Sequence, residues 1–218
     1  MRWTSIAISL LIITSGLQGS RALTRVDQDL RVIHAEYTLA ATDLGHVNGE
    51  LIRYRTSVIR TIEADSEEAF RRIADSLPHK RARIDKAIGR FVKATNDVSI
   101  GKRMDSRELA ELKAVQDKLD SYITSSHRTI QLMEQRWTTQ SASEAQRLTD
   151  EAIDNAANDA GVKFIGVTSE LDRLLEVVAQ IAGEVKKDAD ARLRLETMII
   201  VGVSVGLAML VLVLPAKK

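Results

Sequence analysis

The sequence contains no cysteine and only two prolines among its 218 residues, and aromatic side chains make up 4% of it. Without cysteine, the chain can form neither disulfides nor thiolate metal sites. So little proline and so few aromatic residues favour long helices over a sheet. Acidic and basic residues are interspersed and nearly balance, giving a formal net charge of +1. This balance gives no indication of nucleic-acid binding.

Motifs for catalysis and metal binding are also scarce. Neither His-Glu-x-x-His nor Glu-x-x-His occurs, and no two histidines are spaced four residues apart; they are His34, His46, His79 and His127. Because cysteine is absent as well, we expect no metal site and no cofactor. No Gly-x-x-x-x-Gly-Lys-Ser/Thr phosphate-binding loop is present either. We therefore expect that the protein is not an enzyme.

The most regular feature of the sequence is an apolar ladder from Leu23 to Val58. Its members recur at alternating intervals of three and four residues, the pattern of a helix that packs against other helices. Charged residues fill the positions between them, and the period-two alternation of a strand is missing. We therefore predict one long first helix. The members are Leu23, Val26, Leu30, Ile33, Tyr37, Ala40, Leu44, Val47, Leu51, Tyr54 and Val58.

A turn near residues 64–66 is predicted to end the first helix. Asp65 and Glu68 there have the spacing of a capping box that opens a second helix. The alternative extends the first helix to residue 75 and places the turn at residues 76–78. The second helix is expected to contain Pro78 and to end at residues 99–101, with Gly101 as its C-cap. Its ladder is Phe70, Ala74, Leu77, Ile84, Ile88, Phe91 and Val98, with Arg81 and Thr95 at two further positions.

Two more amphipathic helices complete the pattern. Asp105 and Glu108 form a second capping box, and the third helix after it has the ladder Leu109, Leu112, Leu119, Ile123, Ile130, Met133 and Trp137, with Gln116 and Ser126 as polar members. The fourth helix is expected to begin near residue 143 and to run without a break. Its ladder is Leu148, Ile153, Ala156, Ala160, Phe164, Val167, Leu171, Leu174, Val178, Ile181 and Val185. Four such helices joined by short turns predict an all-α, up-down-up-down four-helix bundle.

Both ends of the chain are apolar. Residues 198–216 carry no charge and are followed by Lys217 and Lys218. About 20 apolar residues cross a bilayer as a helix, and lysines favour its cytoplasmic side. We therefore predict a transmembrane helix at residues 198–216 and a cytoplasmic stub at residues 217–218.

The N-terminal residues 1–22 allow two interpretations. They are either a transmembrane anchor that continues into the first helix or a cleaved signal peptide. The sequence has no clean small-x-small cleavage triplet at this point, which favours the anchor. In both cases, residues 23–197 form a domain outside the cytoplasm.

Two candidate sites follow from these elements. Arg53, Arg55 and Arg60 cluster on the outer half of the first helix, where arginines can bind a carboxylate through paired hydrogen bonds. Alternatively, this cluster is a solvated face balanced by nearby acidic residues. Gly202 and Gly206 form a Gly-x-x-x-Gly pair that lets two membrane helices approach closely. Alternatively, these residues reflect how common glycine is in membrane helices.

The whole pattern resembles the four-helix-bundle sensory module of bacterial methyl-accepting chemotaxis receptors and related sensor kinases. The likeness rests on the order of anchor, helical domain and second span, and on residues 51–68 and 170–175. It implies a protein of the bacterial inner membrane with a periplasmic sensory domain. It also implies a parallel homodimer built around the first helix, a ligand near the dimer interface, and signalling by a small shift of the last helix.

The resemblance also bears on the candidate arginines and on the partners. In members that bind aspartate, arginines spaced five and then four residues apart on the first helix hold the ligand's carboxylates. Arg55 and Arg60 match the first spacing, whereas Ala64 occupies the third position. Such receptors continue into a HAMP linker and a signalling domain, and none follows residue 218 in this sequence. We therefore expect either a separate signalling partner or a truncated receptor.

Two functions are consistent with the sequence. The first is a membrane-bound sensory module that detects a small molecule or a protein outside the cytoplasm. The second is a membrane-tethered helical scaffold or protein-interaction module that binds no small ligand. A histidine phosphotransfer bundle using His79 or His127 is disfavoured, because the residues beside these histidines do not match that family's motif.

Overall fold

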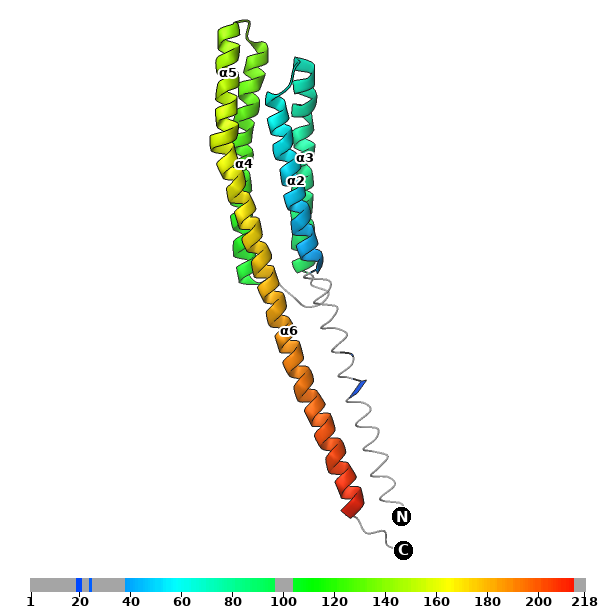
Figure 1. Ribbon diagram of the computed structural model, residues 1–218. Coiled ribbons are helices and arrows are strands. Elements are labelled where there is room, and N and C mark those ends of the chain that lie inside the picture. The colour runs from blue at the N-terminus through cyan, green and yellow to red at the C-terminus, as the bar shows by residue number, and fades with distance from the viewer. Residues whose placement is uncertain (1–18, 21–23, 25–37, 97–103, 214–218) are drawn as a thin grey trace. The chain divides into compact units, whose positions relative to one another are not determined.

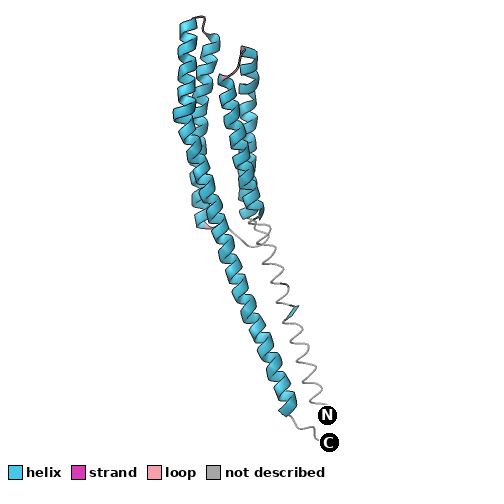
Figure 2. Ribbon diagram, in the orientation of Figure 1, coloured by secondary structure: helices cyan, strands magenta, loops and turns pink. Residues whose placement is uncertain are grey.

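The computed structural model describes residues 19–20, 24, 38–96 and 104–213, and every regular element in these ranges is helical (Figure 2). The chain divides into two compact units, Glu36–Gln180 and Met1–Ala35 with Ile181–Lys218. In the first unit, α2 packs along α3 as one antiparallel hairpin, and α4 packs along α5 as another (Figure 1). The elements are α2 (Leu39–Ile62), α3 (Glu67–Thr95), α4 (Ser106–Thr138), α5 (Ala142–Asp154), the π-helical turn η3 (Asn155–Asp159) and α6 (Ala160–Val213).

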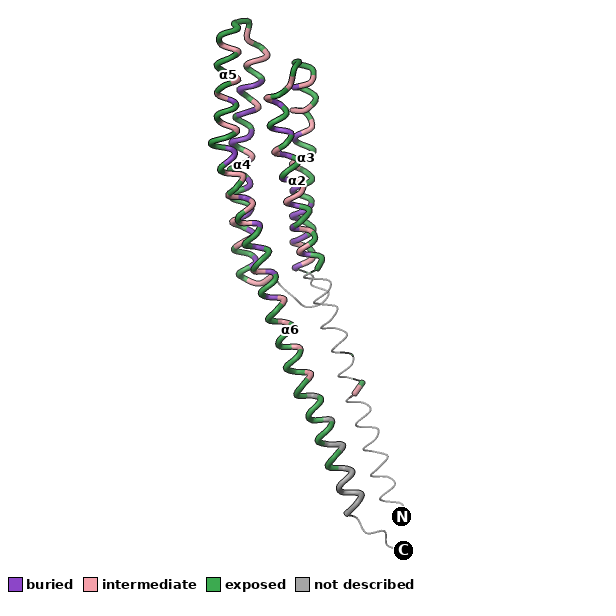
Figure 3. The backbone as a smooth tube through the Cα atoms, viewed as in Figure 1, coloured by how far each residue is buried: buried purple, intermediate pink, exposed green. Residues whose placement is uncertain are grey.

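Helix α2 buries the face that its apolar ladder predicts. Side chains spaced alternately three and four residues apart stack on one side of a helix, and buried residues run as a stripe along α2 (Figure 3). The ladder members from Leu23 to Tyr37 lie outside the described residues. The remaining members are at most 5% exposed, and they are Ala40, Leu44, Val47, Leu51, Tyr54 and Val58.

The turn between α2 and α3 lies at the predicted place, but its capping residue differs. Because α2 ends at Ile62 and α3 begins at Glu67, the alternative turn at residues 76–78 is wrong. Ser66, rather than Asp65, caps α3, and its Oγ accepts a hydrogen bond from the Ala69 N–H at 3.2 Å. Aspartate and serine are about equally good caps, so the sequence alone could not choose between neighbours.

Helix α3 continues through Pro78 and ends at Thr95, with Asn96 as its C-cap. This end comes before the predicted one at residues 99–101, and the predicted cap, Gly101, lies outside the described residues. Buried members of the predicted ladder are Phe70, Leu77, Ile84, Ile88, Phe91 and Thr95. Phe70 also joins the two hairpins in one apolar cluster, together with Leu132, Met133, Leu148 and Ala152.

Helix α4 begins with the predicted capping box. The Asp105 carboxylate accepts a hydrogen bond from the Arg107 N–H at 2.8 Å, and Glu108 Oε2 accepts one from the Asp105 N–H at 3.0 Å. These bonds satisfy N–H groups that a helix leaves without partners in its first turn. Glu108 is only 1% exposed, so the box also closes this end of the core.

Replacing Asp105 with alanine should lower the free energy of unfolding by about 1 kcal/mol, because the first turn of α4 loses its side-chain acceptor. Chemical unfolding of the full chain, followed by circular dichroism, measures this change. Asp117→Ala is the matched control, since it removes only an exposed ion pair with Lys113, and such pairs contribute about 0–1 kcal/mol. Equal losses in the two variants would contradict a specific capping role for Asp105.

The buried face of α4 differs from the predicted one. Leu112, Leu119, Ser126 and Met133 are buried as expected, but Leu109 is 58% exposed. At the other ladder positions, the buried residue is the one immediately before the predicted residue in the sequence. These buried residues are Glu108, Val115, Tyr122 and Thr129, in place of Leu109, Gln116, Ile123 and Ile130. Leu112, Leu119, Ser126 and Met133 belong to two possible ladders. The predicted ladder adds the residue four positions after each of the first three, and the observed one adds the residue three positions after. The prediction followed the ladder that contains Ile123 and Ile130.

The fourth helical segment continues without a break from Ala142 to Val213, as predicted, but it contains a π-helical turn that the prediction lacked. In η3 the Ala160 N–H bonds to the Asn155 carbonyl, five residues back rather than four. The extra residue rotates the buried face by about 100°. The buried residues are Leu148 and Ala152 before the turn, and Ala160 and the later ladder members after it. The predicted member Ile153 is 50% exposed.

Glycine at position 161 accommodates the widened turn. A Cβ added there would lie 3.1 Å from the Ala156 carbonyl oxygen, closer than a side chain usually packs.

The predicted membrane segments lie in the second unit. Helix α6 runs into residues 198–216 as far as Val213, and residues 214–218 lie outside the described ranges. Of residues 1–22, the structure describes only residues 19–20. Within the described residues, no helix is sufficiently long and apolar to cross a membrane.

Candidate functional site

Three aromatic rings from three helices meet in the core of the first unit. Tyr122 on α4 packs edge-to-face against Tyr54 on α2, with ring centroids 6.0 Å apart, and against Phe164 on α6, at 5.6 Å. Tyr122 is 1% exposed, and its hydroxyl interacts with that of Ser126 without the geometry of a normal hydrogen bond. Burial raises the pKa of Tyr122 to about 12, because the charged phenolate would be poorly solvated there. The ring cluster therefore contains a buried hydroxyl that is poorly satisfied.

Arg55 extends this cluster toward the surface. Its guanidinium carbon lies 4.3 Å from the centre of the Phe164 ring, the geometry of a cation–π contact. Arg55 is half-buried and has no ion-pair partner in the part of the chain that the structure describes.

A polar layer lies between α4 and η3. Ser126 and Thr129 of α4 are 0% exposed, and Ser125 is 4% exposed. The Asn155 side-chain amide donates to the Ser125 carbonyl at 2.9 Å and to Thr129 Oγ1 at 2.8 Å. Ser125 Oγ donates to the Asp159 carboxylate, which also accepts from Lys163 Nζ at 2.8 Å. The bonds from Lys163 and Ser125 lower the pKa of Asp159.

The sequence analysis predicted Ser126 as a polar member of the buried face, but it missed Ser125 and Thr129 because it assigned Ile123 and Ile130 to the core. The signal that could have revealed it is the spacing Leu119–Tyr122–Ser126–Thr129–Met133, alternately three and four residues, combined with the amide and carboxylate of the facing segment 155–159.

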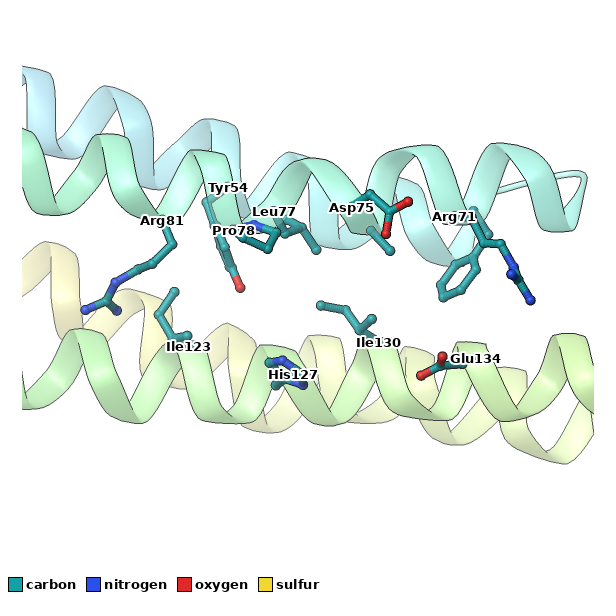
Figure 4. A pocket seen from close by; sticks show the side chains of 12 residues that line it. Tyr54, Arg71, Asp75, Leu77, Pro78, Arg81, Ile123, His127, Ile130 and Glu134 are labelled. Carbon is teal, nitrogen blue, oxygen red and sulfur yellow. The ribbon is translucent and has the colours of Figure 1, made fainter.

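A cavity of about 480 Å³ lies between α3 and α4 (Figure 4). Small-molecule sites commonly have volumes of roughly 300–1,000 Å³. Ile123 and Ile130 line this cavity because the buried face of α4 is shifted by one residue. The full lining is Tyr54, Phe70, Arg71, Ala74, Asp75, Leu77, Pro78, Arg81, Ile123, His127, Ile130 and Glu134.

The arginines of the cavity wall are paired with carboxylates outside it. Arg71 forms an ion pair with Glu67 at 2.6 Å. Arg81 donates through Nε to both carboxylate oxygens of Asp85, at 3.0 and 3.1 Å, and through a terminal nitrogen to Asp120 at 2.9 Å. The positive charge of the wall is therefore already balanced.

The other ionisable residues of the wall are unpaired. Asp75 on α3 and His127 and Glu134 on α4 form no hydrogen bond or ion pair with any residue that the structure describes. Figure 4 shows Asp75 and Glu134 on the two helices that border the cavity. Both carboxylates are exposed to solvent, and they are the charges of this wall that have no protein partner among the described residues.

Pro78 leaves a backbone acceptor beside the cavity. Proline has no N–H, so the Ala74 carbonyl four residues earlier lacks its usual helical donor. Ala74 and Pro78 both line the cavity. The wall of α3 therefore includes a carbonyl with no donor within its own helix.

A family model described as a four helix bundle sensory module for signal transduction matches residues 4–193. The chain belongs to this family. The match covers most of the sequence and confirms the resemblance that its helical pattern indicates. No curated protein and no solved structure matches the chain.

In this sensory module, the three predicted arginines do not converge on one site. Arg53 bonds to Glu50 at 2.6 Å, and Glu50 also accepts from Arg83 of α3 at 2.6 Å. Burial raises the pKa of Glu50, but the bonds from the two arginines outweigh this effect and lower it overall. Arg55 packs on Phe164, whereas Arg60 is exposed and has no partner among the described residues. A carboxylate-binding role for these arginines stays a prediction.

Gly202 and Gly206 lie in the last part of α6, in the second unit. A Cβ added at either glycine would meet no atom of the described residues within 4 Å. The face that they share is therefore open in a single copy of the sensory module, and its use in dimerisation stays a prediction.

The described part of the sensory module offers no obvious metal chemistry. None of its histidine, aspartate and glutamate side chains gather in a group of three or more that could hold a metal ion. The family is defined by signal transduction rather than by a reaction.

Proposed function

We propose that the protein is the membrane-bound sensory module of a chemoreceptor-like signalling protein and detects a small molecule outside the cytoplasm. The family match supports a sensory role, and it is the observation that carries the proposal. The cavity between α3 and α4 supports a small ligand. The uncharged residues 198–216, followed by two lysines, support membrane attachment with residues 23–197 outside the cytoplasm.

We further propose that the sensory module acts as a parallel homodimer through α2. Gly45, Ile52 and Ile59 are seven residues apart, so they share one face of the helix. Ile52 is 49% exposed and Ile59 is 39% exposed. A row of exposed aliphatic side chains next to a small residue fits a helix–helix contact between two copies.

The absence of cysteine makes the proposed topology directly testable. Ser121→Cys on an exposed face of α4 and Lys218→Cys at the C-terminus give single labelling sites in an otherwise cysteine-free chain. In intact spheroplasts, a membrane-impermeant maleimide should label position 121 and leave position 218 unlabelled. After lysis, both positions should react. Labelling of position 218 alone in intact spheroplasts would overturn the proposed orientation.

Ligand detection is measured on the same full chain in detergent micelles. A panel of amino acids, organic acids, amines and small aromatic compounds is tested for an increase in thermal stability. A ligand at 100 times its Kd should add about 2.7 kcal/mol if it binds only the folded state. Lack of any effect across the panel would favour the helical scaffold instead.

A further inference from the structure

We infer that the cavity between α3 and α4 binds an organic ammonium ion with an apolar or aromatic body. This inference rests on the proposed function, because it names the class of small molecule that the sensory module detects. It concerns a site within a single protomer, formed by residues other than the three predicted arginines.

The charges of the wall favour a cation. Arg71 and Arg81 already donate to Glu67, Asp85 and Asp120, which lie outside the cavity lining. Asp75 and Glu134 have no such partner among the described residues. A positively charged ligand would therefore complement two carboxylates and would displace no existing ion pair.

A carboxylate ligand would meet the opposite situation. To bind Arg81, it would have to compete with Asp85 and Asp120, each of which accepts a charge-assisted hydrogen bond. A carboxylate bound instead near Arg71 would face Glu134, which Figure 4 shows at that end of the cavity, and like charges in close proximity repel.

The uncharged groups of the wall point the same way. An ammonium group has three N–H donors and no acceptor, and the Ala74 carbonyl is an acceptor without a helical donor because of Pro78. Tyr54 and Phe70 contribute aromatic rings, whose faces attract cations.

The remaining wall is suited to the body of the ligand. Leu77, Ile123 and Ile130 contribute aliphatic surface from both bordering helices. Small-molecule sites are typically apolar with a few polar groups that fix orientation. Carboxylates at the wall and aliphatic side chains between the helices therefore match an amphipathic amine rather than a small inorganic cation.

Three probes with a common aromatic body test the head group. The full chain in detergent is titrated by calorimetry with 2-phenylethylammonium, 3-phenylpropionate and 2-phenylethanol. The ammonium probe should bind at least tenfold more tightly than either of the others. Tighter binding of 3-phenylpropionate, or equal binding of all three probes, would overturn the inference, and so would the absence of binding by the ammonium probe.

Matched variants test the site. Asp75→Asn and Glu134→Gln should each weaken binding of 2-phenylethylammonium at least tenfold, because each removes one charge with little change of shape. Asp172→Asn is the control, since Asp172 is exposed on α6 and outside the cavity lining. Ala74→Phe should abolish binding by filling the cavity, with circular dichroism confirming that the helices remain. Unchanged binding in both carboxylate variants would place the probe elsewhere and overturn the inference.

Failure of this inference differs from failure of the proposed function. If a compound without an ammonium group stabilises the chain and residue 121 is labelled from outside, the sensory function stands and the ligand class is wrong. If 2-phenylethylammonium binds the cavity but residue 121 is protected in spheroplasts, the ligand class stands and the extracytoplasmic function is wrong.

Discussion

Replacing Tyr122 with alanine should lower the free energy of unfolding by about 3–5 kcal/mol, the cost of removing a large aromatic side chain from a core. Tyr122 is among the largest fully buried side chains, and it packs against both Tyr54 and Phe164. Alanine at this position would leave a cavity where three helices meet. Chemical unfolding of the full chain measures the change.

Replacing Tyr122 with phenylalanine should instead raise the free energy of unfolding. The Tyr122 hydroxyl is buried, and its interaction with the Ser126 hydroxyl lacks the geometry of a normal hydrogen bond; a poorly satisfied buried polar group costs about 1–3 kcal/mol. Tyr122→Phe removes that group and keeps the ring contacts, so it should raise the free energy of unfolding by about 1 kcal/mol or more. A loss of stability in this variant would show that the hydroxyl, and not only the ring, holds the helices together.

Deleting one residue from η3 should leave the chain folded, whereas deleting one from the regular part of α6 should unfold it. Without Ala157, the segment can continue as an α-helix with the buried faces on both sides still aligned. Without Ser169, the helix beyond it turns by about 100°. The side chains rotated out of the core would be Leu171, Leu174, Val178 and Ile181.

The two deletions should differ widely in their effect on the free energy of unfolding. Truncating one buried leucine costs about 2–5 kcal/mol, and whole domains are stable by only about 5–15 kcal/mol. The free-energy cost of deleting Ser169 should therefore exceed the stability of the whole domain. Deleting Ala157 should cost mainly the hydrogen bonds of Asn155. Thermal unfolding followed by circular dichroism distinguishes the two outcomes. A cooperative transition in the Ser169 deletion, or its loss in the Ala157 deletion, would contradict the role assigned to η3.

The elements that could be predicted from sequence are those fixed by local chemistry. The α2 ladder has one consistent spacing, and Asp105 with Glu108 satisfies the first turn of α4 without help from other helices. The buried face of α4 is different, because its two possible spacings differ by a single residue. Only contacts with the neighbouring helices place Tyr122 inside and Ile123 at the cavity, and those contacts are not local in the sequence.

The cavity between α3 and α4 could not be predicted from the sequence for the same reason. The arginines that stand out in the sequence do not line the cavity, whereas Asp75 and Glu134 resemble any other acidic residues on helix surfaces. Their common location follows from the way α3 and α4 border one cavity, and their lack of a partner follows from the ion pairs that Arg71 and Arg81 form elsewhere. Spacing along one helix predicts the pairs Arg71–Glu67 and Arg81–Asp85, which are four residues apart. It cannot predict which side chains of different helices border the same cavity.

The close approach of the Ala156 carbonyl to position 161 makes the glycine there depend on the extra residue of the π-helical turn. The Ala156 carbonyl that crowds position 161 does so because it belongs to the widened turn. A relative that lost the extra residue would release this restriction, and alanine at position 161 would then stabilise the helix by about 1 kcal/mol over glycine. Chain length and glycine should thus change together among descendants of a common ancestor. Aligned sequences alone would then reveal which relatives retain the π-helical turn.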